Sequence, residues 1–94
     1  MFRANISITA FDCRCRRAVM QCLADLPFAP QPGIDLGWVK SGTDDWSGVV
    51  ETTIWSVDEQ MFHVEMEDWC SRGLMLEEMI ALLGPTWRRI DRAA

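Results

Sequence analysis

The sequence has no tyrosine and one histidine, and its basic residues are fewer than its acidic ones. There are 14 aspartates and glutamates against 9 lysines and arginines, so the net charge is −5. We expect no direct nucleic-acid binding, because that function depends on a basic surface. Motifs for phosphate, dinucleotide, calcium and RNA binding are missing, and no catalytic signature is present. We therefore expect a non-enzymatic protein that needs no cofactor.

Long hydrophobic segments are also missing. No apolar run approaches the ~20 residues that a membrane-spanning helix requires, so we expect no membrane association. Met1–Phe11 has neither the hydrophobic stretch nor the cleavage pattern of a secretory signal peptide. We expect a cytoplasmic protein, located in the host cytoplasm if the gene belongs to a phage. In that reducing compartment the four cysteines would be free thiols.

What is present is typical of one small globular domain over residues 1–94, with 49% hydrophobic and 24% charged residues. Hydrophobic and polar residues alternate from Phe2 to Ala10, which predicts a strand buried on one face. Asp12 then suits a helix N-cap, and an apolar stripe at helical spacing predicts a helix up to Leu26. The residues of that stripe are Cys15, Val19, Cys22, Leu23 and Leu26.

The rest of the chain predicts three strands and a C-terminal helix. The strands cover residues 34–41, 49–57 and 60–67, and the buried face of the second is ambiguous. The helix has apolar residues at helical spacing over 76–83 and ends at Gly84, and a short turn or helix follows from Pro85 to Asp91. The order β-α-β-β-β-α predicts an α+β two-layer sandwich, with an antiparallel sheet and helices on one face.

Charge is distributed unevenly along this predicted fold. Residues 35–70 contain nine acidic residues and a single basic one, Lys40, and they carry a net charge of −8. Alternate residues of a strand lie ~6.6 Å apart and neighbouring strands ~4.8 Å apart, so carboxylates on one sheet face would resemble a row of phosphates. Such a face attracts basic grooves. The predicted partner-binding residues are Asp44, Asp45, Glu51, Trp55, Asp58, Glu59, His63, Glu65 and Glu67.

Two alternatives start from the cysteines and the arginines. Cys13 would lie in the first turn of the predicted helix among arginines, a setting that favours a reactive thiolate, so a small thiol enzyme or redox sensor is one alternative. The four cysteines lack the paired spacing of zinc sites, so we expect no metal site. The remaining alternative classes are a structural subunit that assembles through Trp and Met contacts and a homodimer that joins complementary charged patches. Its basic patches would be Arg14, Arg16 and Arg17 with Arg88, Arg89 and Arg92.

The leading hypothesis is an inhibitor or interaction protein whose acidic sheet face, within residues 35–70, occupies a basic surface of a nucleic-acid-binding protein or complex. In size and charge, though not in any motif, the chain looks like phage anti-CRISPR and other anti-defence proteins and like nuclease immunity proteins. The resemblance implies nucleic-acid mimicry as the mechanism.

Overall fold

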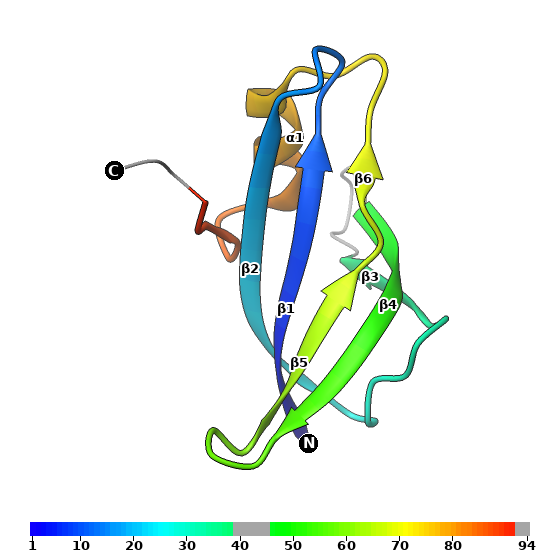
Figure 1. Ribbon diagram of the computed structural model, residues 1–94, viewed down its shortest axis with the longest axis vertical. Coiled ribbons are helices and arrows are strands. Elements are labelled where there is room, and N and C mark those ends of the chain that lie inside the picture. Colours follow the sequence, from blue (N-terminus) through cyan, green and yellow to red (C-terminus); the bar gives the residue numbers. More distant parts are fainter. Residues whose placement is uncertain (39–45, 92–94) are drawn as a thin grey trace.

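The first two strands of the protein form a long antiparallel hairpin (Figure 1). In the computed structural model, which describes residues 1–38 and 46–91, β1 (Phe2–Phe11) pairs with β2 (Arg17–Leu26) over ten residue pairs. The predicted first strand is confirmed. Its core face is also as predicted: the side chains at every second position, Ala4, Ile6, Ile8 and Ala10, are buried.

The helix predicted between Asp12 and Leu26 is wrong, because this segment forms a tight turn followed by β2. The apolar residues of this segment fit both the helical period of about 3.6 residues and the strand period of two. The structure has the strand period, with Ala18, Met20 and Cys22 buried. Pairing with β1 satisfies the backbone groups of both strands, and the two alternating core faces form one continuous surface.

In the described part of the chain, five further strands complete a mixed sheet. They are β3 (Asp35–Trp38), β4 (Trp46–Ser56), β5 (Met61–Met66), β6 (Trp69–Cys70) and β7 (Arg88–Arg89). The order is β3-β4-β5-β1-β2-β7, and β6 continues the line of β5 along β1. The meander of three strands is present, although residues 39–41 of the predicted strand 34–41 lie outside the described residues.

Two features of the predicted architecture need correction. β5 and β6 run parallel to β1, so the sheet is mixed and not antiparallel. The predicted order β-α-β-β-β-α also fails, because the described residues contain one helix and more strands than expected. What holds is the coarser expectation of a small, sheet-dominated α+β fold.

A β-bulge at Glu51 decides the ambiguous faces of β4. Val50 pairs with Met66 and Thr52 with Glu65, so β4 has one residue more than β5 at this point. Beyond the bulge, Ile54 pairs with His63 on the outer face, and Trp55 pairs with Phe62 on the core face. Trp55 and Phe62 also make an edge contact, with ring centroids 4.9 Å apart.

The predicted helix over 76–83 is confirmed as α1 (Leu76–Leu83), and Gly84 follows it with a φ of 91°. In Figure 1 α1 lies behind β1 and β2, and its residues Leu76, Met79 and Leu83 belong to the buried core cluster. The turn or helix predicted from Pro85 to Asp91 instead contains β7, which pairs with the middle of β2. In the described chain, no helix has the length and apolar character that a membrane crossing needs.

Candidate functional site

Exposed acidic side chains lie on the outer face of β5, opposite α1, at Glu65, and continue just beyond the end of this strand. Glu65 lies between Thr52 of β4 and Ser7 of β1, and Glu67 follows two residues later, just beyond the end of β5. We call the exposed carboxylates of β4, β5 and their flanking turns the acidic surface. It consists of Glu51, Asp58, Glu59, Glu65, Glu67 and Asp68.

Three arginines of the two basic clusters, Arg16, Arg17 and Arg89, are paired with other acidic residues, whereas Arg14 and Arg88 form no ion pair within the described residues. In the described parts of the chain, no arginine forms an ion pair with the acidic surface, in which only Glu59 has an ionic contact, 3.0 Å from His63. The arginine pairs are Arg16–Asp12 at 2.8 Å, Arg89–Asp91 at 2.9 Å, Arg16–Glu77 at 3.3 Å, Arg3–Asp25 at 3.9 Å and Arg17–Asp91 at 4.0 Å. The negative charge of the acidic surface is therefore not neutralised by these arginines.

The structure brings together part of the predicted binding set. Glu65 is on β5, Glu67 lies just beyond its end, and the bulge residue Glu51 is on the neighbouring strand β4. Trp55 lies on the core face and is 45% exposed at the end of the sheet, so it does not stand among these carboxylates. The other members of the predicted set lie in or next to the β4–β5 turn, or outside the described residues. Asp58 and Glu59 are in that turn, His63 follows it, and Asp44, Asp45 and the basic-cluster residue Arg92 lie outside the described residues.

A small recess of about 110 Å³ adjoins Glu65 on this outer face. Register places Thr52, Glu65, Ser7 and Gln21 side by side on four neighbouring strands, and Asn5 is in the next row. Sequence reasoning missed these neutral polar residues as site residues. The outward positions of the first strand already contained Asn5 and Ser7. Gln21 was hidden by the incorrect helix, and the parallel pairing of β1 with β5 has no local signal.

A second polar centre surrounds the buried side chain of Asp12. Its Oδ1 accepts hydrogen bonds from the backbone N–H groups of Arg14 and Arg16, at 2.9 and 2.8 Å. Its Oδ2 accepts from Arg16 Nε at 2.8 Å and from the Leu76 N–H at 3.2 Å. The predicted N-cap therefore bonds the first residue of α1, 64 positions away, and not a helix of its own.

These bonds also set the protonation of Asp12. Burial acts to raise the pKa of its carboxyl group, but the backbone and side-chain hydrogen bonds of Arg16 and the backbone bond of Arg14 outweigh it. The pKa of Asp12 is therefore lowered, and the group is ionised at neutral pH. An ionised carboxylate that holds the 12–16 turn against α1 has a structural role.

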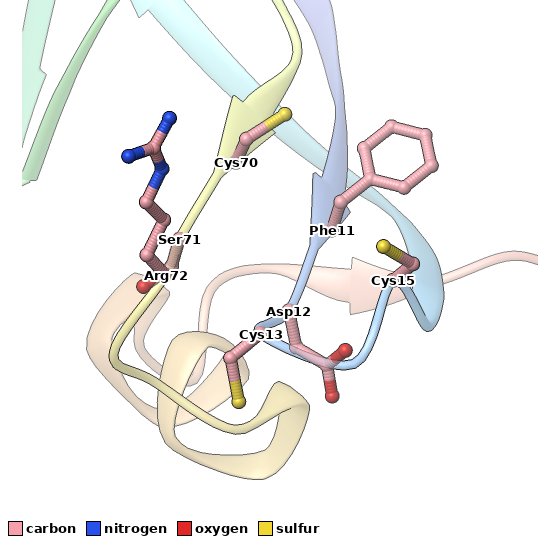
Figure 2. A pocket seen from close by; sticks show the side chains of 7 residues that line it. All are labelled: Phe11, Asp12, Cys13, Cys15, Cys70, Ser71 and Arg72. Carbon is pink, nitrogen blue, oxygen red and sulfur yellow. The ribbon is translucent and has the colours of Figure 1, made fainter.

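A hollow of about 440 Å³ lies beside this turn, and Cys13, Cys15 and Cys70 are among the residues that line it. All three are free and exposed, and in Figure 2 their sulfur atoms point in different directions. Cys13 Sγ lies 3.5 Å from the Met75 sulfur. No cluster of three or more His, Cys, Asp or Glu side chains in the described ranges is arranged to hold a metal ion.

The helix expected to activate Cys13 is absent. Cys13 lies in the turn between β1 and β2, and its backbone N–H donates to the Leu74 carbonyl at 3.2 Å. No helix dipole therefore acts on this thiol from a helix that begins at Asp12. What remains for a thiol function is the exposure of the sulfur at the edge of a hollow.

No family model matches the sequence, and neither a curated protein nor a solved structure is significantly similar to it. We therefore infer the function from the geometry and charge of the chain itself.

Proposed function

We propose that the protein is a non-enzymatic binding protein whose acidic surface docks onto the basic, nucleic-acid-binding surface of a partner protein. The observation that carries the proposal is the uncompensated charge of this surface. Glu51, Asp58, Glu65, Glu67 and Asp68 are exposed, and no described basic side chain forms an ion pair with any of them. Arg16, Arg17 and Arg89 are paired with acidic residues elsewhere, and Arg14, Arg72 and Arg88 form no ion pair within the described chain.

Glu65 and Glu67 are two residues apart along the chain, which is ~6.6 Å in an extended segment, and Glu51 is on a neighbouring strand ~4.8 Å away. These spacings are close to those of phosphates along a nucleic-acid strand. Self-repulsion of this kind costs stability, and the arrangement therefore favours a function that uses the charge. A basic groove would gain long-range attraction and a higher association rate. The classes that use this chemistry and fit the size of the chain are phage anti-defence proteins, including anti-CRISPR proteins, and nuclease immunity proteins.

The proposal is tested by reversing charge on the acidic surface. In the double variant Glu65→Lys/Glu67→Lys two exposed side chains change and the neighbouring core residues Val64 and Met66 stay, so the melting temperature should stay close to the wild-type value. A partner that cross-links to the wild-type protein in native host extract should no longer cross-link to the double variant. Duplex DNA or RNA should compete for that partner, and its association should weaken as salt is raised.

A matched control reverses charge elsewhere. Arg14→Glu/Arg72→Glu changes two exposed arginines that make no ion pair in the described chain, and it should leave capture of the same partner unchanged. If the arginine variant loses the partner and the acidic-surface variant keeps it, the acidic surface is a solvated face and the proposal is wrong. A captured partner that nucleic acid does not displace would also contradict nucleic-acid mimicry.

A thiol function is the second candidate, and the hollow beside the β1–β2 turn favours it. Cys13, Cys15 and Cys70 all line this hollow, and all three are exposed (Figure 2). The test is Cys13→Ser in whichever biological assay the partner defines. Full activity of the variant would remove the thiol function, and loss of activity with intact partner binding would support it.

A further inference from the structure

The recess beside Glu65 has the chemistry of a receptor for one cationic side chain. Across the sheet, Thr52, Glu65, Ser7 and Gln21 form one row, because each pairs with the next on a neighbouring strand. Neighbouring strands are ~4.8 Å apart, so the row is short enough for one flat polar group to reach several of its members. The second row of the same face contributes Asn5 and its register partner His63, whose Nε2 lies 3.0 Å from Glu59 Oε1.

These side chains have hydrogen-bonding capacity that the folded chain leaves unused. In the described residues, Asn5, Gln21 and Thr52 make no side-chain hydrogen bond, and Glu65 has no ionic partner. Ser7 Oγ donates to the Val64 carbonyl at 3.4 Å, and its lone pairs are therefore available to accept. Asn5 and Gln21 are half-buried as residues, and their amide groups remain accessible to solvent and to a ligand.

We propose that this recess binds a single arginine side chain of a protein partner. A guanidinium group carries five N–H donors in a planar fork and no acceptor. Glu65 offers the charge and two carboxylate oxygens, and the hydroxyl and amide oxygens around it offer further acceptors. Ile54, which is 67% exposed and also lines the recess, provides an apolar wall for the methylene groups of the side chain.

Other occupants fit less well. An anion would meet the Glu65 carboxylate. A lysine ammonium has three donors on a compact charge, so it contacts fewer members of the row than the planar guanidinium group of an arginine. The neighbouring hollow of about 380 Å³ shares Asn5 and Gln21 with the recess and is lined by Arg88. Arg88 repels a second cationic side chain of the partner there, so the site binds one arginine and not a run of consecutive arginines.

This inference rests on the proposed function only in taking the partner to be a basic protein, and it is tested without knowing that partner. The probe is the tripeptide acetyl-Gly-Arg-Gly-amide, titrated into the ¹⁵N-labelled full chain and followed by NMR. Asn5 is the only asparagine of the sequence, so its side-chain NH₂ signals report on the recess without ambiguity. We expect these signals and those of Gln21 to shift saturably. The neutral citrulline peptide should bind about tenfold more weakly or worse, and the lysine peptide should also bind more weakly.

Two matched variants separate the recess from diffuse attraction. Glu65→Gln removes the carboxylate that lines the recess and should weaken binding of the arginine peptide by about fivefold or more. Glu67→Gln removes the same charge two residues away and should change the affinity for this peptide by less than about twofold. No saturable shift at Asn5, or equal losses in the two variants, would overturn the inference. If the peptide fails to bind but the acidic surface still captures a partner, the proposed function stands without the recess. If the peptide binds and the charge-reversal variant of the acidic surface still captures the partner, the arginine site is supported and the proposed function is wrong.

Discussion

The substitution Asp12→Asn tests the tertiary contact that joins the β1–β2 turn to α1. The side chain of Asp12 has no solvent exposure and accepts four hydrogen bonds from three residues, Arg14, Arg16 and Leu76. Asparagine preserves the shape. Its carbonyl oxygen can still accept from the two turn amides, but its NH₂ group replaces Oδ2 and faces two donors, Arg16 Nε and the Leu76 N–H.

We therefore expect two hydrogen bonds to be lost and two donors to be left without an acceptor. Bonds to charged groups are among the stronger ones in proteins, and donors left unpaired in a buried position carry an additional desolvation cost. For a domain of this size the combined loss should lower the melting temperature by roughly 10–20 °C. Thermal unfolding followed by tryptophan fluorescence and by circular dichroism measures it. The control Glu77→Gln weakens only an exposed 3.3 Å contact to Arg16 and should shift the melting temperature by less than about 3 °C.

Acid stability provides an independent check on the same group. The pKa of Asp12 is lowered in the folded state, because the hydrogen bonds of Arg16 and Arg14 outweigh the effect of burial. The folded chain therefore binds fewer protons than the unfolded chain near pH 4, and stability is lost as the pH falls from about 4 through the folded-state pKa. Asp12→Asn cannot titrate, so its melting temperature should depend less on pH in this window. A variant that melts within about 3 °C of wild type and shows the same acid dependence would refute this account of Asp12.

Three further predictions follow from the core face, the turns and the thiols. Val64→Ala should destabilise the protein by about 1–3 kcal/mol in urea unfolding, because Val64 is 1% exposed, and Glu65→Ala on the opposite face should change stability by less than about 0.5 kcal/mol; equal effects would contradict the observed strand faces. Gly84→Ala should cost about 1–3 kcal/mol in the same assay, since its φ of 91° is unfavourable for any residue with a Cβ, and an unchanged midpoint would show that the helix can end otherwise. In partial labelling with iodoacetamide, mass spectrometry should find exposed Cys13 modified before buried Cys22, and the opposite order would contradict their placement.

Several elements could be predicted from local sequence because one period fits and the other does not. The alternation of Phe2–Ala10 suits only a strand, and the apolar spacing of Leu76–Leu83 followed by Gly84 suits only a helix. The third such segment, 60–67, alternates with the same clarity, and its Val64 and Met66 are buried as predicted. In each of these segments the burial pattern and the backbone propensity agree, so no distant contact is needed to decide the structure.

The segment from Arg17 to Leu26 shows where local reasoning fails. Its apolar residues fit a helical stripe through Val19 and Leu23 and equally a strand face through Ala18 and Met20. The hydrogen bonds that decide between them join this segment to β1, and they exist only once the hairpin has formed.

The candidate site combines both kinds of information. The concentration of acidic residues in 35–70 and the outward positions of Glu65 and Glu67 follow from composition and strand period alone. The place of Trp55 was decided by the bulge at Glu51, which reverses the faces of β4 beyond it. The neighbours of Glu65 were decided by parallel pairing between β1 and β5, whose residues are more than 50 positions apart. Sequence by itself determined how much charge the protein presents and on which strand, because these depend on residues near one another in the chain. The tertiary structure alone decided which polar groups surround each carboxylate, because strand pairing brings together residues that no local period relates.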